Sequence, residues 1–135
     1  MSRVLFVCTH NAGRSQMSEA FFLRAAGSDH EGRSAGTDPA DHLHPNVVLA
    51  MQEIGIDLTS RIPQRLTDEL ARWPDVVVTM GCGDACPIIP GKRYIDWELR
   101  DPSGLAVDEV RQIRDDIDAR VKDLVKDLDH ATIHR

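Results

Sequence analysis

The stretch RVLFVCTHNAGRSQMSEAFFLRAAG, residues 3–27, predicts a strand, a short loop and a helix. Residues 3–8 are almost all apolar and rich in β-branched and aromatic side chains, which is typical of a strand buried on both faces. Residues 15–26 follow as a helix with Met17, Ala20, Phe21 and Leu23 expected to turn inward, and Gly27 is a suitable C-terminal cap. A buried strand leading directly into a helix indicates an α/β domain with a parallel sheet.

The remainder of the chain continues this alternation. We expect strands or helices at residues 32–37 (short strand), 45–54 (helix ending before Gly55), 68–73 (short helix), 75–80 (buried strand), 93–97 (weaker strand) and 107–128 (long amphipathic helix). The predicted fold is therefore a single α/β domain over residues 1–135. Its sheet has four mainly parallel strands, with helices on both faces.

Composition narrows the class of protein. The chain has 135 residues, 41% of them hydrophobic and 28% charged, with a net charge of −6. These values are ordinary for a soluble globular protein, and the acidic balance argues against a nucleic-acid partner. The sequence lacks the run of about 18 apolar residues that a membrane span needs. We also expect no signal peptide, because the apolar stretch within the first ten residues is too short and is not followed by a small-residue cleavage site. We expect a cytoplasmic protein, and because nothing marks a dimer interface, a monomer.

The loop after the first strand has the chemistry of an oxyanion site. In a parallel sheet, ligands bind beyond the carboxyl ends of the strands, at the N-termini of the helices that follow. Cys8 ends the strand there and Ser15 begins the helix, so the backbone N–H groups and the helix dipole favour a bound anion and a cysteine thiolate. The guanidinium of Arg14 can hold two oxygens at once. Ser15 can donate a hydrogen bond to the thiolate.

Within this loop, Asn11 and Gly13 suit the positive backbone angles that a tight turn requires. His10 is expected to be a loop residue and not a catalyst. The predicted nucleophile is Cys8. The predicted oxyanion-binding residues are Thr9, His10, Asn11, Ala12, Gly13, Arg14 and Ser15.

A departing oxygen also needs a proton donor. Asp101 is followed by Pro102, which holds the acid in an extended conformation before a turn, in a loop beyond the fourth predicted strand. If the sheet is parallel, this loop lies at the same edge as Cys8. General acid catalysis is the favoured role for Asp101, and an acid that merely starts an Asp-Pro turn is the alternative.

Two further cysteines, Cys82 and Cys86, lie just beyond the third predicted strand. A structural zinc site needs four ligands, and only Cys8 and scattered histidines remain to complete one. Inert loop cysteines are a second alternative. The favoured hypothesis is thiol exchange, in which Cys82 attacks whatever forms on Cys8 and Cys86 relays the disulfide outward.

Taken together, these segments resemble the low-molecular-weight phosphotyrosine phosphatase superfamily, and within it the thioredoxin-coupled arsenate reductases. The resemblance covers nearly the whole chain. It rests on CTHNAGRSQMSEA (8–20), SAGT (34–37), VVVTM with the two cysteines after it (76–86), DPSG (101–104) and VRQIRDDIDARV (110–121). Each motif alone is common, and it is their combination that is specific.

The resemblance implies a sequence of roles. Cys8 would attack arsenate, Arg14 and Ser15 would hold the oxyanion and the thiolate, and Asp101 would assist the leaving group. Cys82 would then attack the Cys8–arsenic adduct, releasing arsenite and forming a Cys8–Cys82 disulfide. Attack by Cys86 would leave a Cys82–Cys86 disulfide for thioredoxin to reduce, after the segment from Cys82 onward partly unwinds. No tightly bound cofactor is implied.

The chain departs from these relatives in three ways. The spacing C-x3-C-P of Cys82 and Cys86 is shorter than the gap in the best-known members. Ser103 stands where tyrosine phosphatases carry an aromatic residue after Asp-Pro, which favours a small inorganic substrate, with phosphate or sulfate as analogues. Some relatives bind potassium near the loop: Asn11, Glu19 and Ser34 match that weak site, whereas Gln64 replaces its aspartate.

Three other functions stay open at this point. The first is a phosphotyrosine-type phosphatase in which Cys82 and Cys86 protect Cys8 by reversible oxidation. The second is an arsenate reductase that uses mycothiol or another small thiol as its reductant. The third is a trigonal-thiolate sensor of arsenite or metal, which would be expected to carry a basic DNA-reading helix that this acidic chain does not show.

Overall fold

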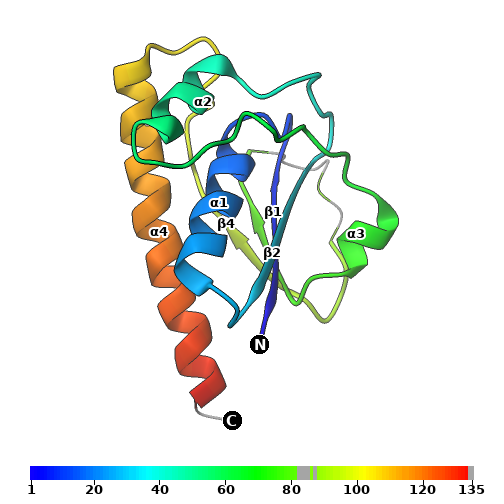
Figure 1. Ribbon diagram of the computed structural model, residues 1–135. Helices are drawn as coiled ribbons and strands as arrows, with labels where there is room; N and C mark the ends of the chain where they lie inside the picture. The colour runs from blue at the N-terminus through cyan, green and yellow to red at the C-terminus, as the bar shows by residue number, and fades with distance from the viewer. Residues whose placement is uncertain (82–85, 87, 134–135) are drawn as a thin grey trace.

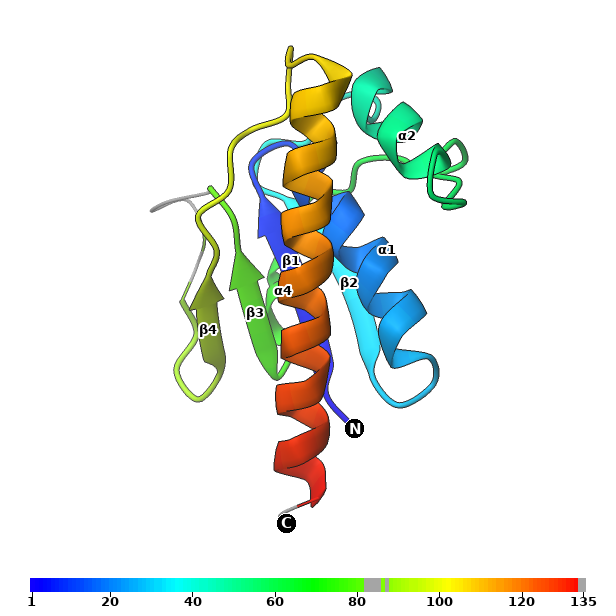
Figure 2. The same cartoon turned by 90° about the vertical axis from the view of Figure 1, so that its left-hand side faces the viewer.

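A four-stranded sheet carries helices on both of its faces, as Figure 1 shows from one side and Figure 2 after a quarter turn. The computed structural model describes residues 1–81, 86 and 88–133, with side chains up to residue 130. Its elements, in chain order, are β1 (Arg3–Cys8), α1 (Arg14–Ala26), β2 (Glu31–Gly36), α2 (Pro45–Gln52), α3 (Asp68–Arg72), β3 (Val76–Thr79), β4 (Arg93–Asp96) and α4 (Val107–Ile133).

The sheet has the order β2-β1-β3-β4, and all three strand pairings are parallel. The inner strand β1 is buried from Val4 to Cys8, which explains why its sequence is apolar at successive positions and does not alternate. Because the strands all run the same way, their carboxyl ends meet at one edge of the sheet. The loops after β1 and β4, and residues 80–81 directly after β3, therefore come together there.

The two faces of the sheet have separate cores. Helices α1 and α4 cover one face and α3 lies on the other (Figures 1 and 2). Under α1 and α4, Phe6 of β1 packs against Phe22 of α1 and against Trp97, with ring centroids 5.5 and 6.0 Å apart. Under α3, Leu5 and Val7 of β1 form the smaller core. Alternate residues of one strand thus serve different cores, which requires helices on both faces.

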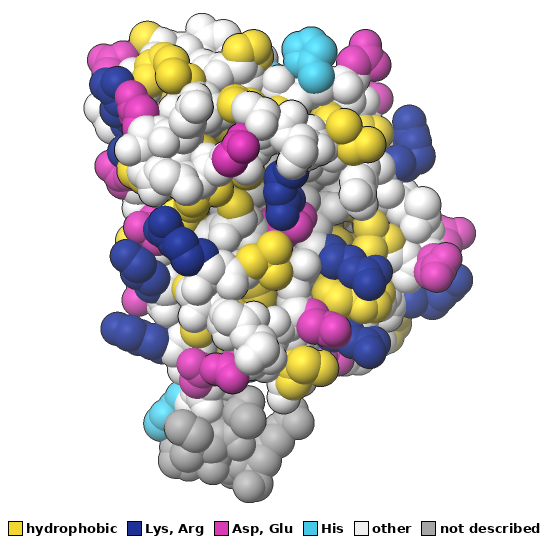
Figure 3. All heavy atoms as spheres, viewed as in Figure 1, with side chains coloured by type: hydrophobic (Ala, Val, Ile, Leu, Met, Phe, Trp, Pro, Cys, Tyr) yellow, Lys and Arg dark blue, Asp and Glu magenta, His cyan; other side chains and the backbone are white. Residues whose placement is uncertain are grey.

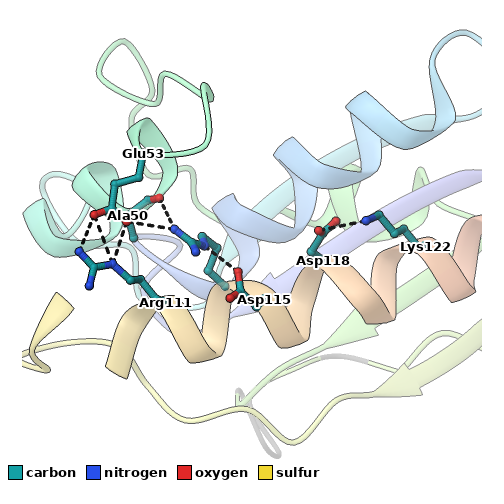
Figure 4. Close-up of polar contacts among 7 residues, drawn as sticks. Ala50, Glu53, Arg111, Asp115, Asp118 and Lys122 are labelled. Carbon is teal, nitrogen blue, oxygen red and sulfur yellow. Dashed lines mark hydrogen bonds and ion pairs between the residues drawn. The ribbon is translucent and has the colours of Figure 1, made fainter. Parts of the chain in front are cut away.

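A cluster of charged side chains joins α2 to α4 (Figure 4). Glu53, just beyond α2, accepts hydrogen bonds from Arg111 Nη2 at 2.6 Å and from Arg114 Nη1 at 3.1 Å. Arg114 also donates to the Ala50 carbonyl and to Asp115, each at 2.8 Å. The hydrogen bonds from Arg111 hold the pKa of Glu53 below its usual range. These contacts fix the end of α2 against α4.

The predicted fold class is confirmed, and most element boundaries lie within two residues of the predicted ones. The helix expected from residue 15 begins at Arg14, and Gly27 caps it with a φ of 58°. The long last helix continues from its predicted end at residue 128 to Ile133. The apolar repeat marks only the part of a helix that packs on a core, so it does not report where the helix itself stops.

In the described part of the chain, no helix is both long enough and apolar enough to cross a membrane. Figure 3 shows acidic and basic side chains interspersed on the face that Figure 1 presents. This mixture fits the many ion pairs on the surface, such as Arg3 with Glu31 at 3.2 Å. Exposed pairs of this kind contribute little to stability, so the fold depends on its two apolar cores.

Candidate active site

The loop between β1 and α1 is held from outside by the segment that follows β2. Backbone N–H groups of residues 38, 40 and 44 donate to the carbonyls of Thr9, His10 and Ala12 at 2.8, 3.0 and 3.0 Å. The C=O and N–H groups of a trans peptide plane point in opposite directions. Because these carbonyls face outward, the N–H groups that follow them face the inside of the loop, where they can bind an anion.

Cys8 is a free, buried thiol at the carboxyl end of β1. Its Sγ lies 2.9 Å from the Oγ of Ser15 in the first turn of α1. That Oγ accepts a hydrogen bond from Asn11 Nδ2 at 2.7 Å. Because the amide nitrogen can only donate, the single hydrogen of Ser15 is left to point at the sulfur. Ser15 is thus oriented to stabilise a thiolate.

Asn11 holds the loop in shape. Its φ of 50° is in the left-handed region, which costs an ordinary residue about 1–2 kcal/mol. Four hydrogen bonds to its buried side chain stabilise this conformation: Nδ2 donates to Ser15 and Ser34, and Oδ1 accepts from Gln16 and from the backbone of Gln64. A backbone N–H can only donate, so the orientation of the amide is unambiguous.

The expectation of positive φ is confirmed for Asn11 and is wrong for Gly13, whose φ is −148°. Gly13 serves a different purpose, which is close approach. A Cβ at this position would lie 2.7 Å from Pro102 Cγ and 3.2 Å from His44 Cδ2. The missing side chain lets the acid-bearing loop and the β2–α2 segment reach the N-terminus of α1.

The N-terminus of α1 is available to an anion. Gly13 is its N-cap and supplies no side-chain hydrogen bond, and the first turn carries no acidic residue. The first N–H groups of a helix have no partner within the helix, and the helix dipole adds partial positive charge. A tetrahedral oxyanion is the ligand that such a helix end binds.

Arg14 crosses the carboxyl edge of the sheet. Its side chain is buried, with Nη1 donating to the Leu99 carbonyl at 3.3 Å and Nη2 lying 4.0 Å from Asp101 Oδ2. A Cβ on Gly81 would stand 2.5 Å from Nη1, so the backbone after β3 also abuts the guanidinium. Within the described residues these are long contacts, and they leave the fork of N–H donors able to hold two oxygens of a ligand.

Asp101 is brought to the site by its loop. Its Oδ1 accepts a hydrogen bond from the backbone N–H of Ser103 at 3.0 Å, while its Oδ2 faces Arg14. From α2, Asn46 donates to the carbonyls of Pro102 and Leu105, both at 2.9 Å. The turn-forming role and a role as acid are therefore compatible, because each uses a different oxygen.

The structure does not bring Cys86 to Cys8. Cys86 is half-buried, disulfide-bonded and packed against the smaller core beside Leu66 and Tyr94. Cys8 belongs to the larger core, on the opposite face of the sheet. Cys82 lies outside the described residues. Any exchange between Cys8 and Cys86 must therefore pass around the edge of the sheet.

The three residues expected near a potassium ion are linked in series. Asn11 Nδ2 donates to Ser34 Oγ at 3.1 Å, and Ser34 donates to Glu19 Oε1 at 2.6 Å. The other oxygen of Glu19 forms an ion pair with Arg61 Nη2 at 2.8 Å. Over residues 1–81, 86 and 88–130, no group of three or more His, Cys, Asp or Glu side chains is arranged to hold a metal ion.

Several neighbours of the site were not identified from the sequence. His44 lies against Gly13, and its partial burial lowers the pKa of the imidazole, against the opposing effect of the Asp101 carboxylate. Arg61 and Asn46 also reach the site from segments that carry no motif. Their positions depend on how the chain crosses over the sheet. The spacing of residues within the sequence does not predict that path.

The class of protein is defined by two features together. The first strand of a parallel sheet ends on a thiol, and the first turn of the next helix carries an arginine and a serine. The chain belongs to the low molecular weight phosphotyrosine protein phosphatase family, whose model matches residues 3–133. The superfamily inferred from the motifs is thereby confirmed.

Three relatives place the chain within the family. A candidate arsenate reductase of Halobacterium salinarum is 46% identical over 129 residues, covering 88% of this chain and 87% of that protein. The thioredoxin-dependent arsenate reductase of Corynebacterium glutamicum is 43% identical with a TM-score of 0.84; the match covers 97% of this chain but only 63% of that one. An arsenate reductase in the phosphate-binding state is 30% identical, with a TM-score of 0.83 and coverage of 94% and 98%.

Proposed function

We propose that this protein reduces arsenate to arsenite with Cys8 as the nucleophile. The observation that carries the proposal is the pairing of a buried free thiol with an oriented hydroxyl donor: Cys8 Sγ lies 2.9 Å from Ser15 Oγ, beside an open helix N-terminus and the Arg14 guanidinium. Named arsenate reductases among the relatives support the same substrate. A tetrahedral oxyanion bound by another relative is phosphate, the shape analogue of arsenate.

In the first step, the Cys8 thiolate attacks arsenic and forms an S–As bond while one As–O bond breaks. Arg14 and the loop N–H groups hold the remaining oxygens, and Asp101 donates the proton with which the departing oxygen leaves as water. Arsenic stays pentavalent in this adduct. Arsenic is removed from Cys8 when a second thiol attacks.

In the second step, the Cys82 thiolate attacks the sulfur of Cys8. The S–S bond forms, the S–As bond breaks, and its electron pair stays on arsenic, which leaves as trivalent arsenite. The Cys86 thiolate then attacks the sulfur of Cys82 and expels the Cys8 thiolate. Two thiols are oxidised for each arsenic reduced, so electrons balance.

Two features of Cys86 support a relay through three cysteines. Cys86 packs on the face of the sheet opposite Cys8, so an intermediate carrier is needed between them. Cys86 is disulfide-bonded while Cys8 is free, so the two cysteines are not bonded to each other, as an exchange through a third cysteine requires. An external dithiol of the thioredoxin type then restores the thiols, and mycothiol or another small thiol is the alternative reductant. Such a protein is expected to act as a monomer in the reducing cytoplasm.

The test is one turnover of fully reduced protein with arsenate and no external thiol, followed by peptide mass spectrometry. We expect one arsenite per chain and the loss of two hydrogens in the peptides of Cys82 and Cys86. In a Cys86→Ser variant the disulfide should stop at Cys8–Cys82, with arsenite still released. Free thiols throughout and no arsenite would contradict the relay.

A phosphatase is the second candidate, because the family model describes phosphotyrosine protein phosphatases. Ser103 is exposed after Asp101-Pro102 and offers no aromatic surface to a phenyl ester. We therefore expect slow hydrolysis of p-nitrophenyl phosphate compared with arsenate reduction. Fast hydrolysis that is indifferent to Cys82→Ser would favour the phosphatase, and Cys8→Ser should abolish both activities.

A further inference from the structure

Arg61 lies between α2 and α3, outside every motif of the active-site loop, yet its guanidinium contacts two side chains of α1. Its Nη2 pairs with Glu19 Oε2 at 2.8 Å, and its Nη1 donates to Gln16 Oε1 at 3.0 Å. The pair is partly buried, with 27% of the Arg61 side chain and 14% of the Glu19 side chain exposed. An ion pair screened from water to this degree is held more firmly than one on the open surface.

These contacts close a ring of side chains that includes the loop. On one side, Gln16 Nε2 donates to Asn11 Oδ1 at 2.9 Å. On the other side, Asn11 Nδ2 donates to Ser34 at 3.1 Å, and Ser34 donates to Glu19 at 2.6 Å. The ring therefore runs through Asn11, Ser34, Glu19, Arg61 and Gln16 and returns to Asn11.

The charges in the ring fix the direction of its hydrogen bonds, in the same sense as the Gln64 backbone N–H that donates to Asn11 Oδ1 at 2.8 Å. Ionised Glu19 can only accept, so Ser34 must donate to it and can accept only from Asn11. Arg61 can only donate, so Gln16 must turn its oxygen to Arg61 and its nitrogen to Asn11. Both constraints present the Asn11 amide nitrogen to Ser15, whose hydrogen then points at Cys8.

We propose that Arg61 is a positioning residue for Cys8. By pairing with the Glu19 carboxylate and orienting Gln16, it supports Asn11 in the conformation that directs the Ser15 hydroxyl to the thiolate. The guanidinium is also the cation of this site: Asn11, Ser34 and Glu19 do not fit a potassium ion while Arg61 neutralises the only carboxylate among them. The inference rests on the proposed function only where it concerns the rate of arsenate reduction; the reactivity of the Cys8 thiol does not depend on it.

The main test is the reactivity of Cys8 towards iodoacetamide as a function of pH, followed on the Cys8 peptide by mass spectrometry. In Arg61→Gln we expect the pH at which the alkylation rate is half-maximal to rise by about one unit. At any pH below the wild-type midpoint, alkylation of the variant should then be about tenfold slower. Arg61→Lys should recover part of the shift, because its ammonium can neutralise Glu19 but lacks the fork that also reaches Gln16. The matched control is Arg93→Gln, which removes an exposed pair with Asp127 at the amino end of β4, the end of the strands away from the active-site loop.

A double-mutant cycle with Glu19→Gln keeps the proposal testable if one variant folds poorly. Because both substitutions open the same ring, the shifts of Glu19→Gln and Arg61→Gln should not add in the double variant. Inorganic phosphate should protect Cys8 from alkylation in the wild type and less well in Arg61→Gln. An unshifted pH profile in Arg61→Gln, with only a lower melting temperature, would make Arg61 merely structural and overturn the proposal.

The cation prediction is tested with potassium, sodium and tetramethylammonium chlorides at equal ionic strength. The wild-type alkylation profile should be the same in all three salts, and a response of the wild type to potassium would overturn the role of Arg61 as resident cation. The failure of this inference can be separated from that of the function. If Arg61→Gln shifts the pH profile of Cys8 alkylation but the wild type does not reduce arsenate, the positioning role of Arg61 stands and the proposed function fails. If the wild type reduces arsenate but Arg61→Gln leaves the profile unshifted, the proposed function stands and the role of Arg61 fails.

Discussion

Arg14 and Arg114 are buried to the same degree, at 7% and 8% exposure, but the protein treats them differently. Arg114 donates hydrogen bonds of 2.8–3.1 Å to a carbonyl and two carboxylates. Among the described residues, Arg14 has one bond of 3.3 Å and a carboxylate at 4.0 Å. One guanidinium has its partners within the fold, and the other is left with long contacts at the edge of the sheet.

The difference distinguishes a structural charge from a functional one. A buried cation is stable only when it is paired and hydrogen-bonded. Arg114 meets this requirement in the folded chain and ties α2 to α4. We expect Arg14 to meet it fully only when an oxyanion binds, in which case its weak pairing in the unliganded protein would contribute to affinity for the ligand. The two arginines are equally buried, and the distances to their hydrogen-bond partners are what distinguish them.

The largest effect is expected from Arg14→Lys. A lysine keeps the charge but loses the fork, so kcat/KM for arsenate should fall about 10²–10³-fold. The melting temperature should stay near that of the wild type, because few contacts within the fold are lost. Steady-state kinetics with the reductant in excess, together with thermal unfolding, measure both. A large loss of stability would place Arg14 in the same category as Arg114.

Arg114→Met should show the reverse pattern. Removing the guanidinium leaves the Ala50 carbonyl without this donor and breaks two contacts to carboxylates, at a cost of about 2 kcal/mol in the free energy of unfolding. Arsenate kinetics of the folded fraction should be unchanged. Urea unfolding measures the change in the free energy of unfolding. Activity that falls in parallel with Arg14→Lys would show that the two sites are coupled.

Gly81→Ala tests whether Arg14 needs the space that the backbone leaves for it. The added Cβ would lie 2.5 Å from Arg14 Nη1, so the guanidinium must move, and we expect activity to fall about tenfold for a displaced transition-state contact. The φ of 89° adds backbone strain, for which Gly91→Ala is the control: its φ is 91° and nothing lies within 4 Å of its Cβ. Equal losses of activity in both variants would attribute the effect to strain.

The smallest effect concerns His44 and pH. Burial lowers the pKa of His44 in the folded protein, so the unfolded chain binds the proton more readily. The stability that neutral His44 provides is complete above about pH 6.5 and is lost as the pH falls from there through the lowered pKa. The charged and titratable groups that act on His44 are Asp101, His10, His42 and Arg14.

The measurement is the difference in melting temperature between wild type and His44→Gln across this range. We expect this difference to be constant above neutrality. On acidification, the melting temperature of the wild type should fall relative to that of His44→Gln. A difference that stays constant at every pH would exclude His44 as a titrating group.

Residues close together in the chain were predictable because the local backbone brings them together. Cys8, Arg14 and Ser15 fall within one strand–loop–helix unit, and the 2.9 Å contact between Cys8 and Ser15 follows once strand and helix form. The left-handed Asn11 was expected for the same reason. Gly13 was misjudged because its role depends on Pro102, which approaches from the distant acid loop.

The sequence by itself determined the alternation of strands and helices, the oxyanion loop and the family, since apolar periodicity and motif spacing are properties of short segments. Only the tertiary structure decided that Arg61 closes the ring behind Asn11, that Asn46 holds the acid loop, and that Cys86 packs on the face opposite Cys8. The physical reason is that these contacts depend on strand order and on crossover connections. Packing of the two cores selects that arrangement over the whole chain at once.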